Sequence, residues 1–326
     1  MIDVHIEVTL FYVVTSCFFT TVLLRILYIF ITDEDFRKRE CYRIMFLMGI
    51  YQVLLGFCYI ASFVFLFEFR SKEALGNVLA ALGSFCFGSI LGHDFILAAN
   101  RINLLCELNI PSSVITILIV VVVFLCMMHF AVVSSSLAGF TYIAGTTFRF
   151  YDLSKPYSKA MGIAVWIYTV FLSVLIFVIY VCILLYLRHK KSRNAAWSLD
   201  KTEMNIAKQS CIYFAFELVM IVYYVLRATY TINSAVLDDY YNVLEFFICV
   251  CLSSIIYLKF NRLEEQQLDK TLIFYISFVH SFRKAVRSQL LPSKSAASWP
   301  CEPSYSAGRN GRILIPFFTA LIDSVS

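Results

Sequence analysis

Residues 91–101 read LGHDFILAANR, an apolar stretch that contains His93 and Asp94 and ends on Asn100 and Arg101. Ionisable side chains are rare in long apolar segments because removing them from water costs free energy. A helix rises 1.5 Å per residue, so Asp94 and Arg101 lie about 10 Å and two turns apart, near one face. The same spacing places His93 and Asn100 near one face. We therefore expect this stretch to form one end of a membrane-spanning helix with a polar side.

The composition of the whole chain points to the same environment. Of the 326 residues, 60% are hydrophobic and only 15% are charged, which is too little charge to cover a soluble domain. A bilayer core is crossed by about 20 apolar residues in helical form. The sequence contains seven such segments and predicts an all-α bundle of seven transmembrane helices, at about 8–31, 44–67, 78–99, 113–136, 162–187, 210–231 and 240–258.

The distribution of basic residues predicts the orientation of the bundle. With the N-terminus outside, the inner loops hold eleven Lys and Arg residues and the outer loops hold five. Short cytoplasmic loops collect basic residues, so an outside N-terminus and an inside C-terminus are favoured. The seven-helix domain then spans 1–262, and 263–326 forms a cytoplasmic tail that is expected to be largely disordered. Residues 137–161 become an aromatic and polar outer loop.

Several classes of site are not indicated by the sequence. None of the eleven cysteines falls in a predicted outer loop, so no outer disulfide is expected. No Cys/His cluster has zinc spacing, and no phosphate-binding glycine loop or Ser/His/Asp pattern stands out. We expect no metal, no cofactor, no nucleic-acid partner and no enzymatic activity. An intramembrane enzyme that uses His93 and Asp94 is the least favoured alternative.

Polar residues inside the predicted spans are candidates for function, because their burial must be offset by a partner or by water. His93 and Asp94 are interpreted as an internal polar switch, or equally as a structural pair that holds neighbouring helices together. Gln52 in the second span and Glu217 in the middle of the sixth are candidates for the same network.

A second group lies near the predicted outer ends of the last two spans. Arg227 and Glu245 fall at similar depth because successive spans are antiparallel, so they either pair across helices or hold a charged ligand. Three tyrosines of the outer half are candidates to line a ligand pocket with them: Tyr223, Tyr224 and Tyr230.

Five short motifs resemble those of nematode serpentine chemoreceptors of class T. They are CYRIMFLMGIYQ (41–52), ILAANR (96–101), FRFYDLSKP (148–156), KQSCIYF (208–214) and IYLKFNR (256–262). Their order and spacing resemble this wider group of receptors over roughly residues 8–265, and class X or a related class is the alternative within it. Gln52 departs from the family pattern, which has an aspartate at that position.

The resemblance implies a G-protein-coupled chemosensory receptor for a small environmental molecule. Such a receptor would be a multi-pass protein of the plasma membrane, for example the membrane of sensory cilia. Its partners would be the ligand, a heterotrimeric G protein and the lipid bilayer. On that reading Arg101 is the helix-three arginine that the G protein engages, with Asn100 in place of the usual acidic neighbour. The basic third inner loop would contribute Arg188, Lys190 and Lys191.

Two other classes of membrane protein remain as alternatives. A ligand-gated channel of the insect gustatory type also has seven helices, but its N-terminus is inside, which the Lys and Arg distribution disfavours. A small-molecule transporter is disfavoured because the two halves of the chain show no obvious repeat.

Overall fold

A computed structural model describes residues 2–68, 73–142, 149–193, 212, 215, 218–219, 222, 246–252 and 254–255. The chain divides into two units between Glu265 and Gln266, and all of the described residues belong to the first unit. The statements below concern this part of the chain.

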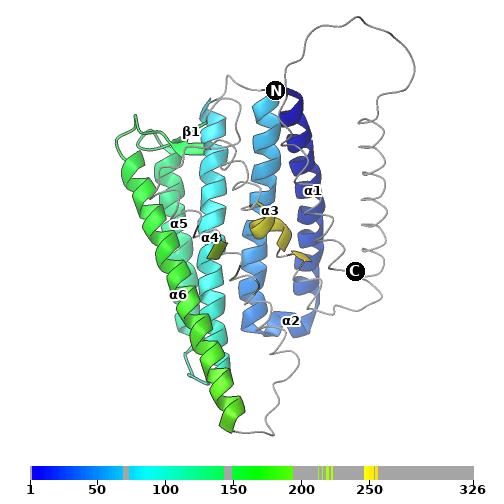
Figure 1. The fold of residues 1–326 in the computed structure, drawn as a ribbon, viewed down its shortest axis with the longest axis vertical. Coiled ribbons are helices and arrows are strands. Elements are labelled where there is room, and N and C mark those ends of the chain that lie inside the picture. Colours follow the sequence, from blue (N-terminus) through cyan, green and yellow to red (C-terminus); the bar gives the residue numbers. More distant parts are fainter. Residues whose placement is uncertain are drawn as a thin grey trace, which may run out of the picture. The chain divides into compact units, whose positions relative to one another are not determined.

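The described part is almost entirely helical (Figure 1). Its helices are α1 (Ile2–Thr32), α2 (Glu34–Lys38), α3 (Glu40–Glu68), α4 (Glu73–Leu105), α5 (Ser112–Ser134), α6 (Ser158–Arg193) and the π-helix η1 (Phe247–Leu252). Two strands, β1 (Phe140–Tyr142) and β2 (Arg149–Tyr151), lie between α5 and α6.

Five of these helices are long and apolar enough to cross a membrane, and they correspond to the first five predicted spans. Their apolar sections are Val13–Thr32, Glu40–Ala61, Leu75–Leu105, Ser112–Ser134 and Ser158–Lys190. Several of the helices continue past the predicted limits; α4, for example, has 33 residues and a length of about 50 Å. A hydrocarbon core is about 30 Å thick, so the ends of α4 reach beyond it at one or both sides.

The predicted sixth and seventh spans fall mostly outside the described residues. Within the seventh, η1 is a short π-helix that is buried over Ile248–Leu252. The Ser254 hydroxyl that follows it donates a hydrogen bond to the Val250 carbonyl over 3.2 Å. This segment contacts α1 and α3.

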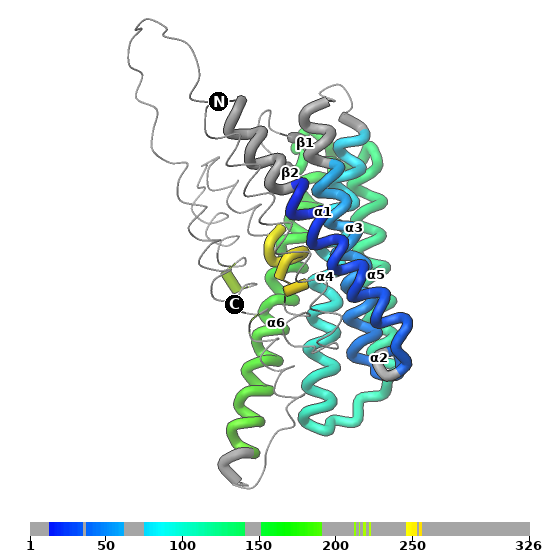
Figure 2. Tube along the Cα trace, turned by 90° about the vertical axis from the view of Figure 1, so that its right-hand side faces the viewer, coloured from blue at the N-terminus to red at the C-terminus, as the bar shows by residue number. Residues whose placement is uncertain are grey.

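Helix α4 is the central helix of the described part, because it contacts α3, α5 and α6 (Figures 1 and 2). Glycines permit some of these close approaches. A Cβ atom on Gly92 would collide with Val122 of α5 and would lie 2.8 Å from the Tyr168 hydroxyl of α6. The same Tyr168 hydroxyl donates a hydrogen bond to the Gly88 carbonyl over 3.1 Å, which fixes the register of α6 on α4.

The main apolar core lies between α1, α3, α4, α5 and η1. It includes Leu23, Met48, Cys86 and Val250, each at most 1% exposed. The other faces of α5 and α6 are apolar but exposed, as Phe124 (61%) and Phe171 (59%) illustrate. Such a band of exposed apolar side chains matches a surface that faces lipid rather than water.

The predicted outer loop contains a short antiparallel hairpin. Phe140, Thr141 and Tyr142 of β1 pair with Tyr151, Phe150 and Arg149 of β2. The Phe140 and Tyr151 rings, which face each other across the hairpin, have centroids 4.6 Å apart. The sequence predicts only an aromatic and polar loop here, so the hairpin is a finding of the structure.

Candidate functional site

Arg101 lies at the predicted inner end of α4 and is largely enclosed by neighbouring helices. The residue is only 7% exposed. Its Nη1 atom donates a hydrogen bond to the Tyr180 hydroxyl of α6 over 3.0 Å. The thiol of Cys41 in α3 is close enough to interact with the same guanidinium. Arg101 therefore joins α3, α4 and α6 at one end of the bundle.

Asn100, the neighbour of Arg101, is fully buried. Neither its side-chain oxygen nor its side-chain nitrogen has a hydrogen-bond partner among the described residues. Burying an amide without a partner costs free energy, so this residue marks a place where further polar contacts are to be expected.

The turn after α4 is held by Asn103. Its Oδ1 accepts a hydrogen bond from the Ile110 amide over 2.8 Å, and its Nδ2 donates to the Ile110 carbonyl over 3.2 Å. Glu107 and Asn109 within the turn have φ angles of 54° and 55°, in the left-handed region that L-residues rarely adopt. The side chain of Asn103 thus ties the turn to the end of α4.

Two of the three basic residues predicted to contact the G protein at the end of α6 have described side chains. Arg188 is exposed. Lys190 lies 3.7 Å from the Glu107 carboxylate and 5.5 Å from the centre of the Tyr186 ring. The Glu107 side chain is 79% exposed, so solvent screens this ion pair and it contributes little to stability. The side chain of Lys191 is outside the described residues.

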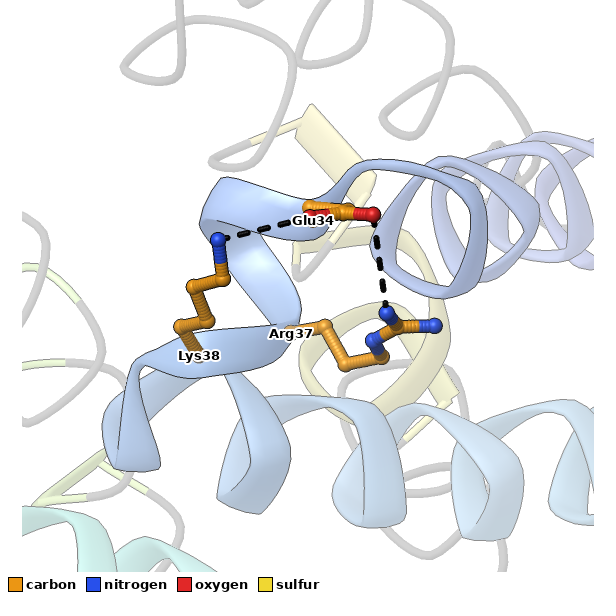
Figure 3. Close-up of polar contacts among 3 residues, drawn as sticks. All are labelled: Glu34, Arg37 and Lys38. Carbon is orange, nitrogen blue, oxygen red and sulfur yellow. Dashed lines mark ion pairs between the residues drawn. The ribbon is translucent and has the colours of Figure 1, made fainter.

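Helix α2 carries part of the positive charge of the first predicted inner loop. The Glu34 carboxylate lies 3.3 Å from the Lys38 ammonium and 3.9 Å from the Arg37 guanidinium (Figure 3). All three side chains are 65–70% exposed, so the ion pairs are weak. They nevertheless place the charge of this loop on a short, ordered helix between α1 and α3.

Of the predicted internal switch, His93 and Gln52 lie in the interior. His93 is fully buried, and its Nδ1 is 2.7 Å from the Ser89 carbonyl, so Nδ1 carries the proton. Its Nε2 is then an acceptor, and it has no hydrogen-bond partner among the described residues. The centroids of the His93 and Tyr51 rings lie 5.2 Å apart. Tyr51 precedes Gln52 in α3.

The other members of the switch and the candidate ligand pocket are placed differently. Asp94 is half-buried on α4. Glu217 and all five residues proposed to form the ligand pocket (Tyr223, Tyr224, Arg227, Tyr230 and Glu245) lie outside the described residues. Where the structure describes the chain, no group of three or more His, Cys, Asp or Glu residues has the arrangement of a metal site.

Comparison with solved structures places this arrangement of helices in a known fold. A crystal structure of squid rhodopsin matches 85% of this chain and 86% of its own, with a TM-score of 0.64 and 12% sequence identity. The chain has a rhodopsin-like fold. No protein-family model and no curated protein sequence matches the chain.

Two parts of this rhodopsin-like fold were missed by the sequence analysis. Tyr180 was not recognised as the partner of Arg101, because one tyrosine among twenty gives no signal of its own. The outer hairpin was missed although the aromatic runs FTY and RFY, separated by the glycine-containing segment IAGTTF, are a usable strand–turn–strand signal. His129 of α5 hydrogen bonds to the Tyr151 hydroxyl of this hairpin over 3.0 Å.

Proposed function

We propose that this chain is a seven-helix G-protein-coupled receptor for small environmental molecules, closest to the nematode serpentine receptors of class T. The rhodopsin-like fold and the five ordered motifs support this proposal. On this proposal residues 1–262 form the receptor domain, with the N-terminus outside, and 263–326 form a cytoplasmic tail. The protein resides in the plasma membrane.

The observation that carries the proposal is the environment of Arg101. This cationic side chain lies at the predicted inner end of α4, is 7% exposed and donates a hydrogen bond to Tyr180 of α6. A cytoplasmic partner reaches this guanidinium only if α6 or another neighbour of α4 moves away. A ligand that favours the separated arrangement therefore exposes Arg101, which is a population shift between two states of the bundle.

The remaining candidates take roles around this movement. Asn100 and the basic residues Arg188, Lys190 and Lys191 would contact the G protein once α6 has moved. The internal polar residues Gln52, His93, Asp94 and Glu217 would set the resting state. The ligand would bind in the outer half, near Tyr223, Tyr224, Arg227, Tyr230 and Glu245.

The test is guanine-nucleotide exchange in cells that express the chain with a panel of Gα subunits. Exchange is measured without ligand and with a library of volatile and water-soluble small molecules. We expect Arg101→Ala to reduce stimulated exchange at least tenfold while surface expression stays near wild type. Arg43→Ala removes an exposed arginine near the predicted inner end of α3 and serves as the matched control.

Either of two results would overturn the proposal. Normal coupling of Arg101→Ala would remove the role assigned to this residue. Ligand-dependent currents without nucleotide exchange on any Gα subunit would instead identify a ligand-gated channel.

A further inference from the structure

The side chain of Asn77, at the predicted outer end of α4, joins three elements of the fold. Its Nδ2 donates a hydrogen bond to the Val133 carbonyl at the end of α5 over 3.1 Å. Its Oδ1 accepts a hydrogen bond from the Phe140 amide of β1 over 2.7 Å. One amide group thereby connects α4, α5 and the hairpin.

The backbone next to this amide is held from the other side as well. Gly139 donates its amide hydrogen to the buried Ser158 hydroxyl over 3.1 Å, and its carbonyl accepts from the Asp152 amide over 2.8 Å. The Lys155 ammonium donates to the Ala138 carbonyl over 3.0 Å. A Cβ atom on Gly139 would collide with the Lys155 ammonium and lie 3.1 Å from Asn77 Oδ1. A larger residue here would displace the Lys155 ammonium and crowd the Asn77 oxygen.

A covalent link cannot fix the hairpin in this chain. No cysteine occurs between Cys126 and Cys182, so neither strand nor the connection between them has a thiol. Both of those cysteines are free. The position of the hairpin must therefore rest on non-covalent contacts, and within the described part of the chain the two Asn77 hydrogen bonds connect it to both α4 and α5.

We propose that Asn77 is a positioning residue that clasps the β1–β2 hairpin to α4 and α5, so that hairpin and helices move together and independently of redox conditions. The clasp itself is a property of the fold. Only its use, the transfer of a ligand contact on the hairpin to the central helix, rests on the proposed receptor function. Because α4 also carries Arg101, such a contact would act on both ends of one helix.

The experiment is hydrogen–deuterium exchange of the full chain in lipid nanodiscs without ligand. Its readout is the Phe140 amide, which donates to Asn77 Oδ1. Asn77→Ala should speed exchange of this amide about tenfold, because one hydrogen bond is worth about a factor of ten in the opening equilibrium. Asn77→Asp retains the acceptor but loses the donor to Val133. It should therefore keep Phe140 exchange within about threefold of wild type, even if the alanine variant folds poorly.

The matched control is Asn103→Ala at the other end of α4. Asn103 makes the same two kinds of hydrogen bond, both to Ile110. Its removal should speed exchange of the Ile110 amide and leave the Phe140 amide unchanged.

Two results would overturn the clasp. One is wild-type Phe140 exchange in Asn77→Ala when Asn103→Ala shows its local effect. The other is Phe140 exchange in Asn77→Asp that is as fast as in Asn77→Ala, which would show that the Oδ1 acceptor does not hold this amide. Neither readout depends on G-protein coupling, so failure of the receptor proposal and failure of the clasp are distinguishable.

Discussion

Tyr180→Phe removes one hydroxyl from the contact between α6 and the buried guanidinium of Arg101. The Tyr180 ring packs against a cluster that includes Leu91 and Ile176, and the phenylalanine ring retains this packing. The substitution therefore removes the hydrogen bond of 3.0 Å from Arg101 Nη1 to the hydroxyl.

The size of the effect follows from the burial and charge of Arg101. A hydrogen bond to a charged group contributes about 1.5–3 kcal/mol in soluble proteins. Hydrogen bonds between helices in membranes average about 0.6 kcal/mol, with a maximum of about 1.7. Arg101 is charged and 7% exposed but also interacts with the Cys41 thiol, so we expect a loss of about 1–2 kcal/mol. At about 2–4 °C per kcal/mol, the midpoint of thermal unfolding should fall by about 2–8 °C.

The buried thiols of the protein provide the assay. A thiol-reactive fluorophore reports the exposure of buried thiols on heating. Five buried cysteines take part in no disulfide: Cys58, Cys86, Cys126, Cys249 and Cys251. Tyr186→Phe is the matched control on the same helix, because its ring under Lys190 is retained. Tyr186 is half-buried, and loss of its hydroxyl away from Arg101 should stay within about 0.5 kcal/mol of wild type. Equal unfolding midpoints for the Tyr180 and Tyr186 variants would refute the assigned role of the Arg101 contact.

Two further predictions concern packing and pH. Gly92→Ala should lower the free energy of unfolding by about 1–3 kcal/mol, and with it the unfolding midpoint, because the added Cβ collides with Val122. Gly88→Ala should have a smaller effect, because the side-chain atom nearest to its added Cβ lies 3.3 Å away. An equal effect of both substitutions would contradict this packing argument. The Ser154 hydroxyl and amide donate to the Asp152 carboxylate and lower the pKa of Asp152 below its ordinary value. The carboxylate therefore stabilises this turn at a pH above the ordinary aspartate pKa, and this stability is lost as the pH falls through the lowered pKa of Asp152. Ser154→Ala should move the pH midpoint of amide exchange in the turn to a higher value. An unchanged midpoint would contradict the assigned hydrogen bonds.

Much of the helical framework follows from apolar length alone. Runs of about 20 apolar residues in the first 190 positions correspond to α1, α3, α4, α5 and α6, because only a helix satisfies its own backbone in a membrane. The ends were less predictable. The polar segment RHKKSR (188–193) continues α6 to Arg193, because hydropathy marks where apolar residues end and does not mark where the helix ends.

The polar contacts between helices could not be predicted to the same degree. The spacing in LGHDFILAANR placed His93 and Asn100 on one face, and both are fully buried. Which helix faces them depends on helix rotation and packing, and these depend on long-range contacts such as Tyr168 with Gly88. Asn77 was overlooked because one polar residue near a span end is common, and its hydrogen bonds join positions 56 and 63 residues away.

The proposed receptor has its N-terminus outside and Arg101 at the cytoplasmic end of α4. Topology tests this most directly: epitope tags at the N-terminus and after Lys270 are probed with antibody on intact and then on permeabilised cells. We expect the N-terminal tag to be labelled on intact cells and the tag after Lys270 to be labelled only after permeabilisation. Labelling of the N-terminal tag only after permeabilisation would place Arg101 on the outer face and contradict the proposed coupling to a G protein.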